Sequence, residues 1–383
     1  MKRGCATLVM LLSLAAPWAV NAAVRQGGDA ERVRSLYAAA RAREEAGDWR
    51  GAEAVWEEVV RLAPADARAW VNLGVARNRQ GRADAAIEVW TRAAALDPQL
   101  AGAHFNVGLA LVRKGEFVSA VQPLRRALAL EPENEAARRA LAAALVGSEK
   151  YREATREIAQ LLARSPRDRE LLELAAQSFV RQRRFAEAAG VLRRRVELED
   201  GGTETLWAMY GDALDGAGRT PEAASAYERA VALAPDSVRT RYGLGFLYWK
   251  LYRYDEAERE LREVLRRDPS MARAAFTLGD LYLTRSQPER AVPLLEQAAR
   301  AYPEEFDTHF ALGRALMQAG ERERAVEELR AAVRLRDEIA DGHYQLGRAL
   351  VQLGRKEEGA RELERARVLQ NAKRAAEAPD KKQ

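Results

Sequence analysis

The chain repeats one pattern of apolar and small residues about every 34 positions. When Ala67 is taken as position 1 of one copy, Trp70, Leu73 and Gly74 occupy positions 4, 7 and 8, and the next copy begins at Ala101. A period of this length is typical of repeat proteins, in which each copy is one supersecondary unit stacked on its neighbours. The copies start at residues 33, 67, 101, 135, 169, 204, 238, 272, 306 and 340.

The spacing within one copy predicts two helices. Positions 4, 7, 8 and 11 form one apolar stripe, and positions 20, 24 and 27 form a second. Position 8 is always Gly or Ala, and position 20 is Ala except at Gly359, so the two helices can cross closely. Proline at position 32 in seven copies ends the second helix. No copy could bury its stripe alone, which predicts an all-α stack of helix pairs.

These residues resemble the tetratricopeptide-repeat (TPR) family. The W-x2-LG stretch that begins at Trp70 matches the family's signature, and Trp207 with Gly211 repeats it in weaker form. The resemblance covers residues 33–370. It implies an all-α, right-handed superhelical solenoid of about ten TPR helix-turn-helix repeats, whose first helices line a concave groove. It also implies that this groove binds peptides or proteins.

The flanks of the repeats carry two further expectations. The chain opens with a basic start, an apolar run and small residues, which is typical of a cleaved secretory signal peptide, with a retained N-terminal anchor as the alternative. The C-terminal tail is polar and is expected to be disordered. The expected segments are a leader at 1–23, a linker at 24–32, repeats 1–5 at 33–202, repeats 6–10 at 203–370 and the tail at 371–383.

One joint between repeats is irregular. Between the fifth and sixth copies, Asp200-Gly201-Gly202 replaces the expected proline and adds one residue to the period. This insertion is interpreted either as a hinge between two half-solenoids or as a loop change that costs little free energy.

Residues suited to catalysis or metal binding are scarce. The single cysteine, Cys5, lies in the leader, so the mature chain has no cysteine metal site. His104, His309 and His343 all fall at position 4, which predicts a packing role at the seam between helices. The sequence has no phosphate-binding loop, nucleophile elbow or metalloprotease motif. We therefore expect a non-enzymatic protein without cofactors or metals.

The groove positions carry the functional prediction. In TPR proteins, positions 2, 5, 6, 9, 12 and 13 of the first helix face the ligand, although an aromatic residue at position 5 is common and partly packs against adjacent helices. An aromatic residue at position 9 is less usual, so Phe246 is the more informative one. Apolar strips and aromatic or Arg anchors are typical of binding surfaces. The predicted groove residues in the last four repeats are Tyr242, Phe246, Trp249, Phe276, Asp280, Leu283, Phe310, Arg314, Met317, Tyr344 and Arg348, and those in the more polar N-terminal repeats are Asn72, Phe105 and Asn106.

Together these features predict a scaffold or adaptor that binds peptides or partner proteins in the groove. The leader places it in the bacterial cell envelope, in the periplasm. The alternative is a membrane-anchored spacer or assembly subunit that faces the periplasm. The 62 basic and 57 acidic residues are interspersed and leave a formal charge of +5, which does not favour a nucleic-acid partner. No small-molecule substrate is expected, and no membrane contact unless the leader is retained.

Overall fold

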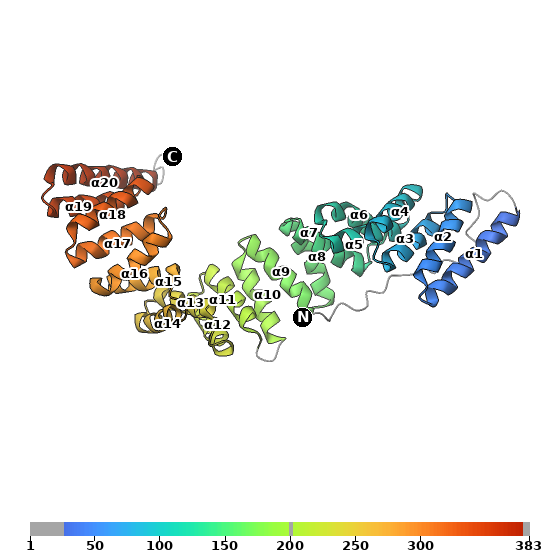
Figure 1. The fold of residues 1–383 in the computed structure, drawn as a ribbon, viewed down its shortest axis with the longest axis horizontal. Helices are drawn as coiled ribbons and strands as arrows, with labels where there is room; N and C mark the ends of the chain where they lie inside the picture. Colours follow the sequence, from blue (N-terminus) through green and yellow to red (C-terminus); the bar gives the residue numbers. More distant parts are fainter. Residues whose placement is uncertain (1–26, 199–201, 378–383) are drawn as a thin grey trace, which may run out of the picture. The chain divides into compact units, whose positions relative to one another are not determined.

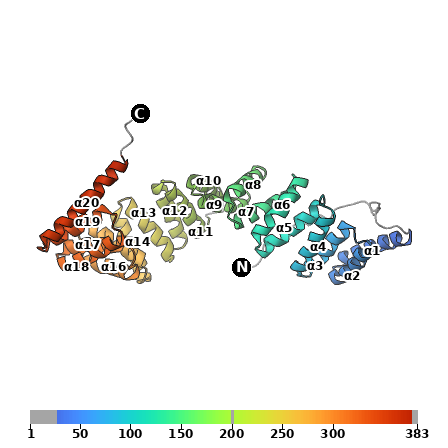
Figure 2. The ribbon, with the colours of Figure 1, turned by 90° about the horizontal axis from the view of Figure 1, so that it is seen from above.

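The computed structural model describes residues 27–198 and 202–377, and these residues form twenty α-helices and no strand. The chain divides into two compact units, residues 1–198 and 199–383. In each unit the helices follow one another in antiparallel pairs (Figure 1, Figure 2). The all-α helix-pair solenoid predicted from the repeat is therefore confirmed.

The helix bounds follow the repeat register. The first unit contains α1 (Gly27–Glu45), α2 (Trp49–Leu62), α3 (Ala67–Arg79), α4 (Ala83–Leu96), α5 (Ala101–Lys114), α6 (Phe117–Leu130), α7 (Glu135–Gly147), α8 (Tyr151–Arg164), α9 (Arg169–Arg181) and α10 (Phe185–Glu197). The second contains α11 (Glu204–Gly216), α12 (Thr220–Leu233), α13 (Val238–Lys250), α14 (Tyr254–Arg267), α15 (Ala272–Thr284), α16 (Pro288–Ala301), α17 (Phe306–Ala319), α18 (Arg322–Leu335), α19 (Ala340–Gln352) and α20 (Lys356–Glu377).

Local side chains fix where the first helix of many repeats begins. Asp66 precedes α3, and its carboxylate accepts hydrogen bonds from the main-chain N–H groups of Arg68 and Ala69. Such capping satisfies donors that a helix start leaves without partners. The same kind of cap precedes α7, α9, α11 and α13, and its residues are Asn134, Asp168, Thr203 and Ser237.

The core lies where the two helices of each repeat cross. A Cβ atom built on Gly108 would lie 2.4 Å from Cγ of Leu124, so the two helices meet at a distance that only a small residue allows. Position 24 supplies many of the largest buried side chains, among them Trp56, Trp90, Leu124, Ile158, Leu192 and Leu261. The small residues at positions 8 and 20 and the large residue at position 24 together set the crossing of each pair.

The residue at position 15 adopts a left-handed conformation in every repeat. Six repeats place glycine there, with φ between 74° and 86°. The other four place Glu149, Arg183, Tyr252 and Ser286 there, with φ between 55° and 61°. A residue with a Cβ atom pays a steric cost in this region. These four turns are therefore strained relative to the glycine turns.

A pair of substitutions tests this strain. Gly115→Ala is expected to lower the free energy of unfolding by about 1 kcal/mol, because an alanine at φ 80° is disfavoured although nothing lies within 4 Å of its Cβ. Glu149→Gly is expected to raise it by about 0.5 kcal/mol, since relief of strain outweighs the added freedom of the unfolded chain. Urea unfolding followed by circular dichroism measures both. Changes of the same sign would contradict the interpretation.

The ends of the repeat region differ from the expected segments. Helix α1 begins at Gly27, within the expected linker, and α20 continues through Glu377, so the expectation of disorder from Asn371 is wrong for the first part of the tail. Alanine, lysine, arginine and glutamate dominate that stretch, and all favour helix. The expected leader lies outside the described residues, as do Asp200 and Gly201. No helix within the described ranges is long and apolar enough to cross a membrane.

Candidate interaction site

Three aromatic side chains of α13 lie on one face of that helix. The ring centroids of Tyr242 and Phe246 are 6.2 Å apart, and those of Phe246 and Trp249 are 5.6 Å apart with nearly parallel planes. Spacing of four and three residues brings side chains onto the same side of a helix. All three are half-buried, so they present a continuous aromatic surface.

This aromatic face is one wall of a pocket with a volume of about 270 Å³. Helix α15 and the start of α17, with the turn before it, supply the rest of the lining, and all of it belongs to the second unit. The lining residues are Tyr242, Phe246, Trp249, Arg273, Phe276, Thr277, Tyr302, Glu305, Asp307 and Thr308.

Two buried threonines contribute little polarity to the pocket. The hydroxyl of Thr277 donates to the carbonyl of Arg273 at 2.9 Å, and that of Thr308 donates to the carbonyl of Glu305 at 2.8 Å. Because both hydroxyl groups already donate hydrogen bonds to main-chain carbonyls of their own helix turn, neither proton is available to a ligand. Away from its charged rim, the pocket therefore presents chiefly aromatic surface.

The rim of the pocket carries three charged side chains. Arg273, Glu305 and Asp307 are exposed, and none of them forms an ion pair or a side-chain hydrogen bond with any of the residues that the structure describes. Glu305 and Asp307 lie at the start of α17, where the helix dipole favours negative charge. Two carboxylates and one guanidinium leave the rim with a net charge of −1.

A further carboxylate lies beside the pocket. The indole Nε1–H of Trp249 donates to Oδ2 of Asp280 at 3.2 Å. Burial raises the pKa of Asp280, while this hydrogen bond and the charge of Arg314 act in the opposite direction. Because burial outweighs them, the negative charge of Asp280 is incompletely compensated in the chain alone.

Five of the predicted groove residues lie outside this pocket, in the ninth and tenth repeats. The guanidinium carbon of Arg314 lies 5.7 Å from the ring centroid of Phe310, and that of Arg348 lies 5.7 Å from the ring of Tyr344. These are cation–π distances. Each aromatic ring is thus covered by an arginine of its own helix. Met317, the fifth, is half-buried against the hydrophobic cluster of α18 and α19.

Three predicted groove residues are buried instead of open. Only 1% of Leu283 is exposed, and Phe105 and Asn106 are each 9% exposed. The expectation of an open position is wrong for these three. Phe105 belongs to the hydrophobic cluster that runs through α4 to α9, and α15 packs against α13, α14, α16 and α17, so adjacent repeats cover these positions. Asn72 is half-buried in the first unit.

Six of the ten lining residues were not among the predicted residues. Arg273 and Asp307 occupy position 2 of their repeats, and Thr277 occupies position 6, so the groove positions of the TPR family contained a signal for them. Tyr302 and Glu305 belong to the turn between two repeats, which those positions do not cover. The turn before α17 therefore adds residues that only the folded chain places at the groove.

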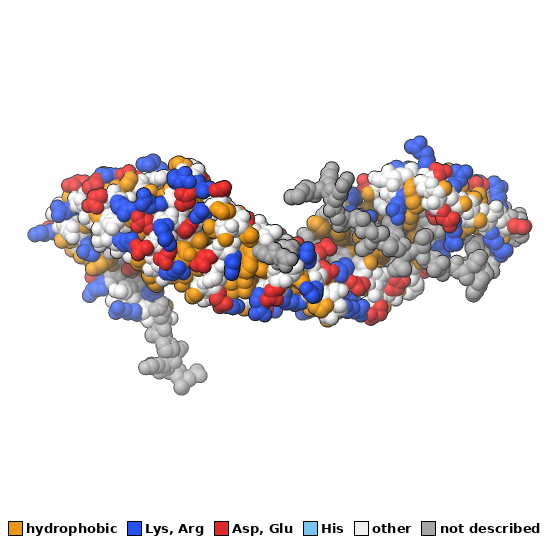
Figure 3. Space-filling model, turned by 90° about the horizontal axis from the view of Figure 1, so that it is seen from below, with side chains coloured by type: hydrophobic (Ala, Val, Ile, Leu, Met, Phe, Trp, Pro, Cys, Tyr) orange, Lys and Arg blue, Asp and Glu red, His pale blue; other side chains and the backbone are white. Residues whose placement is uncertain are grey.

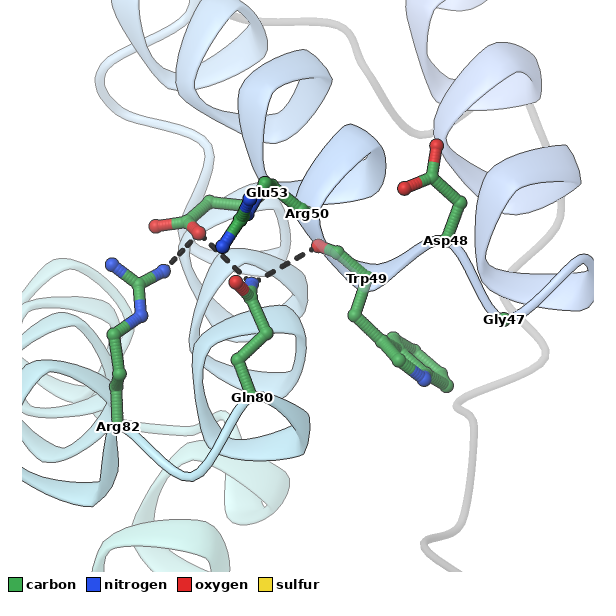
Figure 4. Close-up of a pocket in the computed structure, with 7 residues that line it drawn as sticks. All are labelled: Gly47, Asp48, Trp49, Arg50, Glu53, Gln80 and Arg82. Atoms are coloured by element: carbon green, nitrogen blue, oxygen red, sulfur yellow. Dashed lines mark hydrogen bonds and ion pairs between the residues drawn. The ribbon is translucent and has the colours of Figure 1, made fainter.

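The first unit has a second hollow, which is polar. Figure 4 shows Glu53, Gln80 and Arg82 pointing toward one another, whereas the ring of Trp49 points away from them. The Glu53 carboxylate accepts from Arg77 Nε at 3.0 Å, from Gln80 Nε2 at 2.9 Å and also from Arg82. These donors already satisfy the carboxylate. The hollow is therefore held by an internal network that joins α2 to the next repeat.

The three histidines join helices, as their position in the repeat predicted. The Nδ1 atom of His309 lies 2.6 Å from Glu328 of the second helix, and its Nε2 atom lies 3.0 Å from the carbonyl of Pro303. His343 makes the same two contacts, with Glu362 and with the carbonyl of Asp337. His104 contacts the carbonyl six residues before it. In these three repeats the histidine at position 4 therefore connects its repeat to the end of the preceding repeat.

The surface combines charges of both signs. On the face drawn in Figure 3, Lys and Arg side chains are interspersed with Asp and Glu over both units, and hydrophobic side chains gather in smaller areas between them. Among residues 27–198 and 202–377, no group of three or more His, Cys, Asp or Glu could hold a metal ion.

Comparisons with known proteins identify the repeat. Sequence models described as tetratricopeptide repeat match residues 37–101, 79–135, 111–178, 216–281 and 282–338. The chain belongs to the tetratricopeptide-repeat family. No curated protein matches the sequence.

Solved structures of TPR proteins resemble part of this TPR chain. "MamA MSR-1 C2" is 26% identical, with a TM-score of 0.41, and the match covers 44% of this chain and 98% of that one. "MamA 41-end from Desulfovibrio magneticus RS-1" is 22% identical with a TM-score of 0.43, over 45% of this chain and 97% of that one. YrrB, described as a TPR protein with an unusual peptide-binding site, is 21% identical with a TM-score of 0.43, over 48% and 94%.

Proposed function

We propose that this TPR protein is a non-enzymatic scaffold or adaptor that binds a polypeptide at the pocket of its second unit. One observation carries the proposal: five half-buried aromatic side chains line a single pocket whose rim charges have no partner among the described residues. Aromatic pockets with a few polar groups are typical binding sites, and aromatic anchors dominate the energy of many interfaces.

The shape and composition of the pocket favour a side chain of a polypeptide as its occupant. A volume of about 270 Å³ suits one large side chain more than a drug-sized ligand. The exposed rim can then contact the neighbouring main chain and side chains of the partner. TPR proteins bind peptides or proteins, which supports a polypeptide as the occupant of this pocket.

We further propose that the protein works in the bacterial cell envelope. The basic start and apolar run of residues 1–23 support this location. Cleavage of the leader would release a periplasmic adaptor, whereas retention would produce a membrane-anchored spacer or assembly subunit. N-terminal sequencing of the protein recovered from the envelope fraction distinguishes them, since cleavage predicts a chain that begins at Ala23 or Val24.

Site-specific photo-cross-linking tests the binding function. A photoreactive amino acid is placed at Tyr242 in the full chain, or at Val118, which is 71% exposed in the first unit. We expect discrete cross-linked products from position 242 and not from position 118, because the aromatic pocket holds one polypeptide segment. Mass spectrometry should identify the same partner peptide in repeated experiments.

Loss of the aromatic wall provides the second arm of this test. Replacing Phe246 and Trp249 with Ala is expected to reduce the yield of those products at least about tenfold, since aromatic anchors carry much of the binding energy. Tyr252→Ala is the matched control, because Tyr252 is 77% exposed on the turn after α13 and does not line the pocket. Equal products from all positions, or products insensitive to the double change, would contradict the proposed function.

A further inference from the structure

The repeats of the second unit differ in whether an arginine follows the aromatic residue of the groove, and this difference bears on what the pocket binds. In the ninth and tenth repeats, position 5 is aromatic and position 9 is arginine, and each arginine lies 5.7 Å from the aromatic ring one turn before it. The chain thus supplies its own cation to Phe310 and to Tyr344. A guanidinium over an aromatic face is an energetically favourable pair.

The seventh and eighth repeats retain the aromatic residue but lack that arginine. Position 5 holds Tyr242 and Phe276, whereas position 9 holds Phe246 and Asp280. Across the described ranges, no lysine or arginine lies over the ring of Tyr242 or Phe276. Both rings line the pocket, together with Trp249, Tyr302 and Phe246, and of these Phe246 has the Lys250 ammonium 5.9 Å from its ring centroid. The rings of Tyr242 and Phe276, which lack a cation from the chain itself, are therefore open to a cation from a partner.

The charges around these rings complement a cation. Glu305 and Asp307 stand on the rim without ion-pair partners in the described part of the chain, and Asp280 accepts a hydrogen bond only from the neutral indole of Trp249. Arg273 opposes them with one positive charge. The charge of Arg314 also acts on Asp280, so three carboxylates against two guanidinium groups leave a local charge of −1, which favours a positively charged group.

We propose, building on the function proposed above, that the pocket binds the side chain of an arginine or lysine in an extended segment of the partner. Its aliphatic stem packs between the aromatic rings of α13 and α15. Its charged end takes the place that Arg314 and Arg348 occupy in the later repeats and pairs with the carboxylates of the rim. A long basic side chain can bury its stem while its head remains paired or solvated.

Labelled peptides test the chemistry of the anchor with the full chain. Four nine-residue peptides share Gly and Ser flanks and differ only at the centre, which is Arg, Lys, Leu or Glu. Fluorescence polarisation should show that the Arg and Lys peptides bind at least about tenfold more tightly than the Leu and Glu peptides, as expected for a cation held by aromatic faces and carboxylates. Added salt should weaken the preference.

Charge variants separate this pairing from general effects. Glu305→Gln with Asp307→Asn is expected to reduce the preference for Arg over Leu at least about fivefold. Glu304→Gln with Asp341→Asn is the control, because it removes the same charge from two exposed acids that do not line the pocket: Glu304 adjoins Glu305, and Asp341 occupies in α19 the position that Asp307 occupies in α17. Asp280→Asn, which preserves shape, should also reduce the preference.

Other outcomes would overturn the proposal. Tightest binding of the Leu peptide would identify an apolar anchor, and tightest binding of the Glu peptide would place Arg273 at the centre of recognition. Binding of none of the four peptides, or an equal loss in the control variant, would likewise reject a basic anchor. The cross-linking from position 242 would still decide the scaffold function, so the two proposals can fail separately.

Discussion

Gly74→Ala is expected to lower the free energy of unfolding by about 3 kcal/mol, although alanine is the better helix former. A Cβ atom on Gly74 would lie 2.2 Å from Nε1 of Trp90, closer than atoms can approach. Trp90 is 1% exposed, and its indole N–H donates to the carbonyl of Val71 at 2.9 Å. The added methyl group must displace a buried ring, and overpacking of a core costs about 1–3 kcal/mol or more.

The same substitution elsewhere in the first unit should have the opposite sign. Gly190 lies within α10, and nothing lies within 4 Å of the Cβ atom that alanine would add. Gly190→Ala is therefore expected to raise the free energy of unfolding by up to about 1 kcal/mol, since glycine in a helix interior costs about that much relative to alanine. The two variants share one chemical change and differ only in what the new methyl group meets.

The first repeat indicates how the chain could relieve the clash at Gly74. There Ala40 occupies position 8 and Trp56 occupies position 24, and the indole of Trp56 donates to Glu44 at 2.8 Å instead of to a main-chain carbonyl.

Two measurements check the prediction for Gly74→Ala. Hydrogen exchange should show faster opening of α3 and α4, because the Trp90 ring between them is displaced, and urea unfolding should measure the loss in free energy of unfolding. A stability equal to that of Gly190→Ala would contradict close packing as the reason for glycine.

The sequence predicted the parts of this structure that recur at a fixed position. The register placed every helix pair, because small residues at positions 8 and 20 and proline at position 32 act within one repeat or at its edge. The left-handed turn at position 15 is visible from the sequence where glycine stands there. At Glu149 or Tyr252 only the position in the repeat predicts the left-handed turn, because residues with a Cβ atom disfavour that conformation.

Exposure in the groove was harder to predict, because it depends on contacts between repeats. Met317 and Leu283 share position 12, yet the first is half-buried and the second has only 1% of its surface exposed. The difference arises from the side chains that neighbouring repeats bring to each position. Tyr302 and Glu305 reach the pocket from a turn, which no groove position describes. The aromatic wall was predictable because its members lie on one helix.

The polar network of Glu53 shows the same limit. Glu53 at position 21 meets Arg77 and Gln80, at positions 11 and 14 of the next repeat. Glu258, also at position 21, meets Tyr282 and Arg285 at the same two positions. Single-helix patterns do not reveal this contact, which joins residues about 24 to 27 positions apart. A comparison of position 21 with the following repeat would have revealed it.

Glu53→Ala is accordingly expected to lower the free energy of unfolding by about 3 kcal/mol at neutral pH. Only 8% of Glu53 is exposed, and its removal leaves the Arg77 and Gln80 donors partly without acceptors in a confined site. Removing one partner of a buried charged network costs about 3–5 kcal/mol, and the remaining contact of Arg77 with Glu57 reduces that loss. Glu88→Gln, at an exposed site of α4, is the control and should change stability by less than about 0.5 kcal/mol.

The dependence on pH distinguishes the charge of Glu53 from its bulk. The hydrogen bond from Arg82, aided by Gln80 and Arg77, lowers the pKa of Glu53 from 4.5 to about 2. A carboxyl group whose pKa is lower in the folded state contributes stability above its unfolded pKa, and that contribution is lost as the pH falls toward the folded value. The difference in stability between the natural chain and Glu53→Ala should therefore be largest above pH 4.5 and should shrink between about pH 4.5 and about pH 2. A difference that stays constant over this range would assign the effect to lost packing and not to the charged network.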